Sequence, residues 1–219
     1  MRAVAVLLRC VSLPMWLAVA GCTTTTIDES RVAPVAIGAG ERVVVLGRRH
    51  SSDYETEPAF VRCVGRGIAG AGATVLPELE FMNRFYPWFE PRTAPMSLKR
   101  FEALMRMPAF AARMHETGLR YIVWVDGHTE TVDKAGSVSC AIGPGGGGCI
   151  GFGTWDDQSK YEASVWDLKQ TRSIATISAE AEGTSYMPAL IVPVPLIARV
   201  RASACEGIGV QLRQLFAGP

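Results

Sequence analysis

The stretch from Gly118 to Thr131, GLRYIVWVDGHTET, constrains the fold more than any other part of the chain. Both of its faces are apolar up to Val125, because large aliphatic and aromatic side chains occupy successive positions, and the run turns polar at Asp126. A strand with two apolar faces is covered on both sides, as a central strand of an α/β sheet is. A helix-like segment precedes this run and a glycine-rich hairpin follows it. We therefore expect it at the centre of a sheet.

Other segments supply further strands and helices for such a sheet. The remaining strand-like runs are Arg42–Leu46, Thr74–Leu76, Ser137–Cys140, Ile150–Thr154, Lys160–Leu168 and Arg172–Ala181. Helical spacing of apolar residues predicts helices from Pro58 to about Gly70, after the cap residue Ser97, from Pro108 to Met114, and from Leu196 towards the C-terminus. With 219 residues, 48% of them hydrophobic, the chain can form one α/β domain with a mixed β-sheet flanked by helices.

Two of these segments carry more detailed expectations. The run Lys160–Leu168 mixes polar and apolar residues on its faces, which suits a strand near a sheet edge. Prolines 188, 193 and 195 are expected to exclude regular structure until the last helix begins at Leu196.

The first residues have the pattern of an export signal. Arg2 and Arg9 flank an apolar stretch, residues 3–20, that is too short to be a membrane-spanning helix. The stretch ends LAVAGC, which resembles a bacterial lipobox. That resemblance implies that residues 1–21 are a lipoprotein signal peptide and that Cys22 becomes the first mature residue, carrying a diacylglyceryl group and an amide-linked fatty acid such as palmitate. The alternative is an ordinary signal peptide with an incidental cysteine.

The residues after Cys22 suggest where such a lipoprotein would reside. Thr23 is not the aspartate that retains lipoproteins of this kind in the inner membrane, so the resemblance implies an outer-membrane anchor and a protein facing the periplasm. Two or more lipid chains hold a protein firmly on a bilayer. Residues 22–41 are rich in threonine, alanine and glycine and are expected to form a flexible tether, with the folded domain at 42–219.

Four cysteines follow the expected lipid site: Cys63, Cys140, Cys149 and Cys205. An even number in an exported chain predicts two disulfides, and sequence alone allows three pairings. The most natural arrangement is a Cys140–Cys149 clasp across the glycine-rich hairpin, with Cys63 and Cys205 joining an early helix to the last one. A four-cysteine metal site is the alternative, although no two cysteines have the close spacing of a zinc knuckle.

Residues 79–89 form the most aromatic stretch of the chain. One interpretation is a short helix whose aromatic rings plug one end of the core. The other is an exposed partner-binding patch, because aromatic residues are enriched at interface hot spots. The candidate partner-binding residues in that case are Phe85, Tyr86, Trp88 and Phe89.

The run GLRYIVWVDGHTE, followed after a loop by KYEASVWDLKQTRSIATISAEAEGTSY, resembles a family of exported lipoproteins. This family includes curli-type secretion lipoproteins and lipoprotein activators of penicillin-binding proteins, and its domain is similar to the amino-terminal domain of TolB. The resemblance implies a mixed sheet flanked by helices, used for docking or assembly and without a catalytic centre. Secretion-pore relatives insert long hairpins into the membrane, whereas residues 137–159 are expected to be too short and too glycine-rich to do so.

Few residues indicate chemistry. The charges nearly cancel, with 22 Lys and Arg against 21 Asp and Glu, so a nucleic-acid partner is not expected. The glycine-rich residues 141–148 lack the Lys-Ser or Lys-Thr of a phosphate-binding loop. The candidate hydrolytic groups are His128 with Asp126 and Glu130, and His50 with Asp53 and Glu55. No cofactor and no metal are predicted.

The leading hypothesis is a lipid-anchored, non-catalytic cell-envelope lipoprotein that acts as an accessory or assembly factor by binding another envelope component, protein or peptidoglycan-linked. An envelope enzyme or small-ligand-binding lipoprotein that uses one of the histidine groups is the alternative. An oligomeric export component is a further alternative.

Overall fold

A computed structural model describes residues 23–50, 53–90, 94, 97–193 and 195–218. The strands are β1 (Thr23–Arg31), β2 (Arg42–Gly47), β3 (Arg49–His50), β4 (Asp53–Tyr54), β5 (Thr74–Leu76), β6 (Leu119–Gly143), β7 (Gly146–Asp167) and β8 (Arg172–Pro193). The helices are α1 (Pro58–Ala69), α2 (Glu78–Arg84), α3 (Leu98–Met105), α4 (Pro108–Glu116) and α5 (Val200–Ala217). None of the helices in this described part is long and apolar enough to cross a bilayer.

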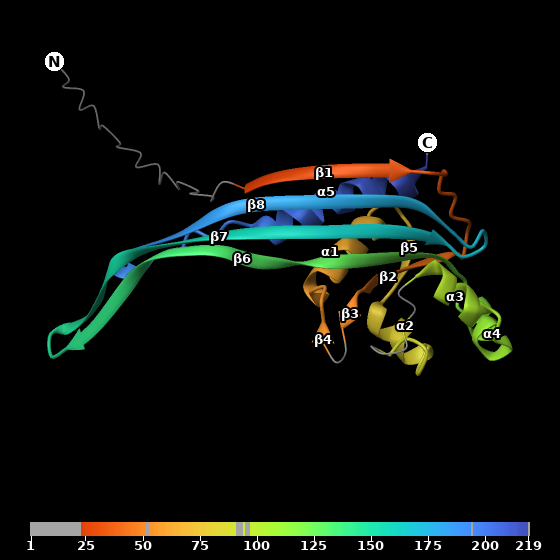
Figure 1. Ribbon diagram of the computed structural model, residues 1–219, viewed down its shortest axis with the longest axis horizontal. Coiled ribbons are helices and arrows are strands. Elements are labelled where there is room, and N and C mark those ends of the chain that lie inside the picture. Colours follow the sequence, from red (N-terminus) through yellow and green to blue (C-terminus); the bar gives the residue numbers. More distant parts are fainter. Residues whose placement is uncertain (1–22, 51–52, 91–93, 95–96, 194, 219) are drawn as a thin grey trace, which may run out of the picture.

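Six strands form one mixed sheet in the order β1-β8-β7-β6-β2-β5. Strand β2 is parallel to both β5 and β6, whereas β6, β7, β8 and β1 pair antiparallel (Figure 1). The fold is the single α/β domain with a mixed, helix-flanked sheet that the sequence predicts.

Strand β6 lies between two separate hydrophobic clusters, one on each face of the sheet. Tyr121, Val123 and Val125 pack against α1 and α5, and Ile122 and Trp124 pack against α2 and α4. All five side chains are buried. The prediction of a central strand covered on both sides is confirmed, because successive apolar residues point to opposite faces of a sheet.

The predicted tether is wrong for the residues that the structure describes. Residues 23–31 are strand β1, which pairs with β8 from Thr23 opposite Gly183 to Arg31 opposite Ala175. Between β1 and β2, Val35 is buried in the core. The β-branched threonines favour a strand once β8 offers a free edge to pair with. Residues 23–31 are therefore part of the folded domain, while the expected signal peptide and Cys22 lie outside the described residues.

Strand β7 is an inner strand, not a strand near the sheet edge as predicted. It pairs with β6 on one side and with β8 on the other. Its mixed pattern arises because Lys160 and Glu162 are exposed on one face, whereas Tyr161 and Ala163 are buried on the other, under α1 and α5. The polar residues mark a sheet face without a covering helix.

Strand β8 continues through Pro188 to Pro193, where irregular structure was expected. Beyond Gly183, β8 no longer pairs with β1 and becomes an edge strand. Proline is tolerated in edge strands because its missing N–H is not needed there. Leu196 does not begin the last helix either. It exchanges two backbone hydrogen bonds with Tyr186, of 2.9 and 2.7 Å, and α5 starts at Val200.

Candidate interaction surface

Strands β6, β7 and β8 extend past the helices as a three-stranded arm, which we define as residues 132–157 and 183–193. The β6–β7 ladder continues to Gly143 opposite Gly146, and β8 accompanies β7 as far as Ile191 opposite Cys149. Figure 1 shows the arm projecting from the body on the side opposite α3 and α4. The sequence-based expectation of a short hairpin at 137–159 is therefore wrong.

Glycines make this long ladder possible. The sequence-based expectation was the opposite, namely that the glycines would keep the hairpin short. Gly127, Gly136 and Gly151 all have positive φ angles, of 122°, 81° and 145°. A Cβ atom at any of them would lie 2.0 to 2.2 Å from a carbonyl oxygen of the neighbouring strand. Only glycine fits such positions, so these residues permit local bends of β6 and β7 without ending the strands.

A disulfide joins the two strands near the arm's end. Cys140 and Cys149 are directly opposite each other in the β6–β7 register and are bonded. The second disulfide connects Cys63 of α1 to Cys205 of α5. These are the two pairs favoured by the sequence, and because all four thiols are consumed, the alternative of a four-cysteine metal site does not apply.

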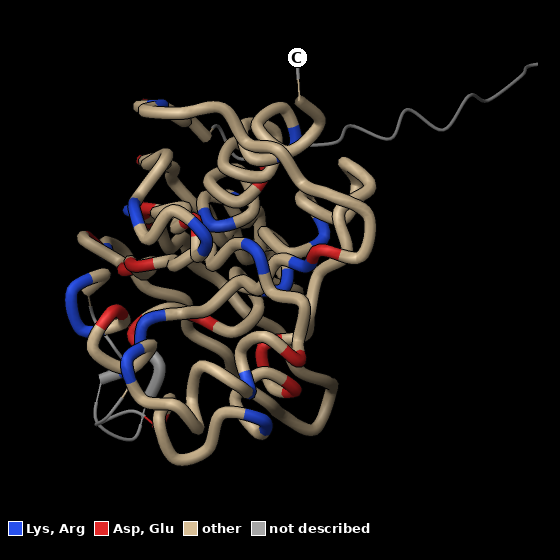
Figure 2. The backbone as a smooth tube through the Cα atoms, turned by 90° about the vertical axis from the view of Figure 1, so that its right-hand side faces the viewer, with Lys and Arg blue, Asp and Glu red and all other residues tan. Residues whose placement is uncertain are grey.

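The arm carries no charged side chain over most of its length. Residues 135–155 and 183–193 contain no Asp, Glu, Lys or Arg. The nearest charges are Asp133, Lys134, Asp156 and Glu182, all at its root. On the end of the body away from the arm, by contrast, Figure 2 shows cations and anions interspersed. The arm is therefore chemically different from the body.

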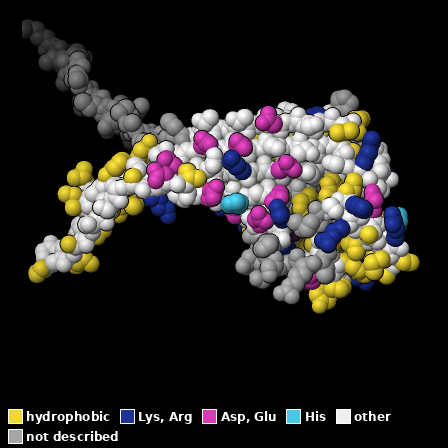
Figure 3. Space-filling view, in the orientation of Figure 1, with side chains coloured by type: hydrophobic (Ala, Val, Ile, Leu, Met, Phe, Trp, Pro, Cys, Tyr) yellow, Lys and Arg dark blue, Asp and Glu magenta, His cyan; other side chains and the backbone are white. Residues whose placement is uncertain are grey.

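One face of the arm presents large apolar side chains to solvent. Ile150 and Leu190 lie opposite each other on β7 and β8 and are 71% and 81% exposed. Phe152, 52% exposed, is two residues from Ile150 and lies 6.2 Å from the ring of Tyr186. We call Ile150, Phe152, Tyr186 and Leu190 the apolar face. Figure 3 shows hydrophobic side chains over the arm, whereas charged side chains cover the middle of the sheet.

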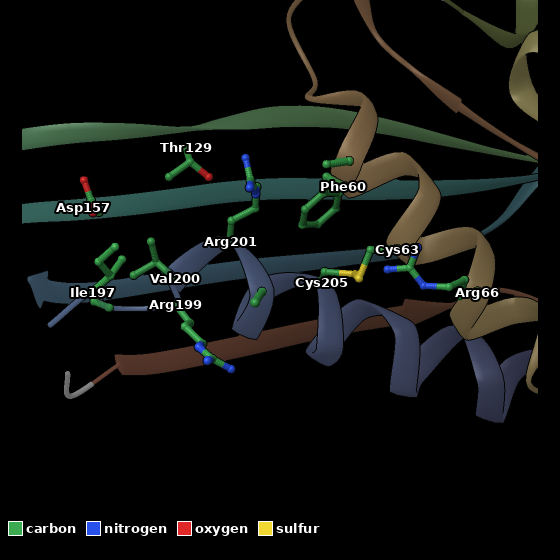
Figure 4. Close-up of a pocket in the computed structure, with 13 residues that line it drawn as sticks. Phe60, Cys63, Arg66, Thr129, Asp157, Ile197, Arg199, Val200, Arg201 and Cys205 are labelled. Atoms are coloured by element: carbon green, nitrogen blue, oxygen red, sulfur yellow. A yellow bond between two sulfur atoms is a disulfide. The ribbon is translucent and has the colours of Figure 1, made fainter. Parts of the chain in front are cut away.

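A cavity of about 440 Å³ lies where the arm meets the body, between α1, the start of α5 and the sheet. Phe60, Val200 and the Cys63–Cys205 disulfide contribute to its wall, and Figure 4 shows Arg201 extending towards the sheet near Thr129. The cavity therefore lies beside the covalent link between α1 and α5.

A hydrogen-bonded network borders this cavity. Glu57 accepts hydrogen bonds from the Tyr161 hydroxyl at 2.6 Å and from the Thr129 backbone N–H at 3.1 Å, and Tyr161 stacks on Phe60 at 3.6 Å. Burial raises the pKa of the Tyr161 phenol above its ordinary value, and the hydrogen bond to Glu57 raises it further, while Arg201 opposes the shift. A tyrosine held protonated in this way fixes the start of α1 on the sheet.

The candidate hydrolytic groups are not assembled into an enclosed site. His128 lies 3.9 Å from Glu130, and both side chains are more than half exposed, at 54% and 58%. Asp126 forms an ion pair with Arg48 at 2.7 Å instead of contacting the histidine. In the other group, Glu55 pairs with Arg48 at 3.2 Å, and the side chains of His50 and Asp53 are not described. Among the described residues, no group of three or more His, Cys, Asp or Glu could hold a metal ion.

The aromatic stretch belongs mainly to the core, which corrects the predicted partner-binding patch. Phe85 and Phe89 are fully buried and pack with Phe110 of α4. Trp88 is partly buried against the same ring, and Tyr86 alone among the four candidates is largely exposed, at 65%. The buried rings fill the space between α2, α4 and the sheet.

Comparisons with known proteins reveal only distant similarity. No family model matches the chain, and no curated protein matches it. Among solved structures it is similar to the PelC dodecamer from Paraburkholderia phytofirmans, with a TM-score of 0.43 at 12% identity over 88% of this chain and 98% of that one. A point variant of the same PelC gives a TM-score of 0.41 at 10% identity over the same shares. Likeness at this level assigns neither a function nor a partner to this chain.

Proposed function

We propose that this chain is a lipid-anchored, non-catalytic cell-envelope lipoprotein of the outer membrane that faces the periplasm. It acts as an accessory or assembly factor by binding another envelope component, and the arm is its contact element. The observation that carries this proposal is the uncharged arm with an exposed apolar face. Soluble proteins seldom expose a contiguous group of large apolar side chains unless it is a contact surface.

Two further features support the envelope location, and a third supports a role in binding rather than catalysis. The lipobox-like LAVAGC sequence supports an envelope location. The two disulfides suit a compartment outside the reducing cytoplasm. The histidine groups that sequence reasoning offered as catalytic candidates include a pair, His128 and Glu130, whose side chains are more than half exposed and lack the enclosure that most active sites provide.

The test compares two variants that place aspartate on exposed apolar positions. In the first, Ile150→Asp and Leu190→Asp put charges on the apolar face. In the matched control, Leu79→Asp changes a residue of α2 that is 69% exposed and far from the arm. Each full-length lipoprotein is extracted gently from membranes, and the components that remain bound are identified. The proposal predicts loss of a bound component with the arm variant only, and equal retention by both variants would refute it.

An oligomeric export component is a second candidate, favoured by the outer edge of β6. The β2–β6 ladder ends at Gly47 opposite Val125, and no described strand pairs with this side of β6 farther along the arm. Such an edge can pair with a strand of another copy. The native mass of the extracted lipoprotein tests this candidate, because a large ring of this chain alone supports it and a monomer contradicts it.

A further inference from the structure

We propose that the arm's apolar face rests in the interfacial layer of a lipid bilayer, as a second membrane contact beside the expected lipid on Cys22. This inference rests on the proposed function, since it assigns the occupant of the same contact element. The chemical class of the partner is phospholipid, and the contact is made by Ile150, Phe152, Tyr186 and Leu190.

The absence of charge is the first reason for choosing lipid. Residues 135–155 and 183–193 include no ionised side chain, whereas the root has Asp133, Asp156 and Glu182. Charged groups are strongly disfavoured in a bilayer, and polar rims are usual around contacts between soluble proteins. The charged root suits contact with water, and the uncharged part of the arm beyond it suits contact with lipid.

The position of the chain's start is the second reason. The described chain begins at Thr23, which pairs with Gly183 where β8 enters the arm. Cys22 is the preceding residue, so a lipid attached there would be joined to the arm's root with no intervening tether. Consecutive Cα atoms are about 3.8 Å apart, so the anchored bilayer surface would lie beside this root. The lipid at Cys22 and the apolar face would then reach the same membrane.

The open edge of β6 limits how deeply the arm can enter. Its outward N–H and C=O groups beyond Val125 have no strand partner in the described part of the chain. Backbone groups in the hydrocarbon core need hydrogen bonds within the protein, since water is absent there. A single arm therefore lies at the interface, with its large apolar side chains towards the acyl chains and the β6 edge hydrated. Tyr186 suits this layer because aromatic side chains with a polar group favour the membrane interface.

The opposite face of the arm also carries apolar side chains near its end. Ile142 is in register with Gly147, on the side of the Cys140–Cys149 disulfide, and Ile142 and Ile191 are 94% and 74% exposed. Farther from the end this face carries Gly151 and Gly153, in register with Ala189 and Met187, where the apolar face carries Phe152. The apolar face therefore extends farther along the arm, and it is the face that we assign to lipid.

The experiment places a tryptophan on the apolar face of the full lipoprotein. Ile150→Trp is reconstituted in vesicles of phosphatidylethanolamine and phosphatidylglycerol, with or without bromine on the acyl chains, and the fluorescence of the native tryptophans is subtracted. The matched control is Lys160→Trp, because residue 160 is on the same face of β7 but belongs to the charged middle of the sheet. Leu190→Trp, opposite Ile150, repeats the test should the first variant fail to fold.

Bromine is expected to remove about half of the emission added at position 150 or 190, with a blue shift, and to leave position 160 unchanged. Equal, low quenching at all three positions would overturn the inference. Cross-linking of arms from separate copies without quenching would also overturn it and assign the face to a second copy. Absence of quenching in these protein-free vesicles, combined with loss of a bound component by the Ile150→Asp and Leu190→Asp variant, would refute the lipid assignment while leaving the proposed function intact.

Discussion

The crossing of α1 and α5 offers a sharp test of the packing, because two glycines face each other there with unequal room. A Cβ atom on Gly67 would lie 2.8 Å from the Cα atom of Gly209 and 3.2 Å from its carbonyl oxygen. A Cβ atom on Gly209 would meet the Cα atom of Gly67 at 3.7 Å, an ordinary contact. Each glycine stands four residues after a cysteine of the Cys63–Cys205 disulfide, which holds the helices together at the same crossing.

The two alanine substitutions are therefore expected to change stability in opposite directions. In a helix interior, Gly→Ala gains about 1 kcal/mol from helix propensity. Gly209→Ala keeps that gain. Gly67→Ala has the same gain but pushes a methyl group against the backbone, and overpacking of this kind costs about 3 kcal/mol at the upper end, so we expect a net loss of about 2 kcal/mol.

Urea unfolding of the two variants and the unsubstituted protein, under oxidising conditions, measures these differences from the transition midpoints at an unchanged m-value. The expected result is a higher midpoint for Gly209→Ala and a lower one for Gly67→Ala. If both substitutions shifted the midpoint in the same direction, the helices would not cross as closely as described, and the packing argument would be refuted.

Three further predictions concern other parts of the body. Replacing Cys63 and Cys205 by alanine should lower the unfolding free energy by about 5 kcal/mol through loop entropy, because their sequence separation is 142. Removing the arm's own disulfide should lower it by about 2.5 kcal/mol, because its sequence separation is 9. Equal losses on urea unfolding would contradict this. Burial raises the pKa of Glu78 above 4.5, so the folded state favours the protonated carboxyl. The contribution of Glu78 to stability therefore falls as pH rises from 4.5 through the folded-state pKa. Glu78→Gln should remove this fall in a series of unfolding curves, and an unaltered pH profile would count against the prediction. Asp167→Ala should lower the unfolding free energy by about 3 kcal/mol, because the buried Arg120 loses the closer of its two carboxylate partners and keeps only Glu41, at 3.7 Å. A loss below about 1 kcal/mol would mean that the Arg120–Asp167 pair is solvated.

The central strand was predictable because its pattern depends only on local sequence. Apolar residues at every position from Tyr121 to Val125 have one simple explanation, which is burial on both faces of a sheet. The helix from Pro58 and the cap at Ser97, whose hydroxyl accepts a hydrogen bond from the Arg100 N–H at 3.3 Å, also follow from local rules.

The remaining features depend on pairing between distant residues. Residues 23–31 have no apolar pattern of their own and become a strand only because β8 provides an edge. In the sequence, the glycines of the arm suggest that the strands end there. In the structure, Gly136 and Gly151 continue the ladder at positions where the backbone of the paired strand comes too close for a Cβ atom. One signal in the sequence could have revealed the arm: residues 135–155 are uncharged between charged flanks, which is unusual for a solvated hairpin.

The most direct test of the account asks whether the arm is covered in the living cell. A photo-activatable cross-linking amino acid is placed at position 150 on the apolar face and, as the matched control, at position 160 in the charged middle of the same sheet face. The account predicts a reproducible adduct, with lipid or with another envelope component, at position 150 and none at position 160. No adduct at position 150, or the same adducts at both positions, would contradict the claim that the arm is the contact element of this protein.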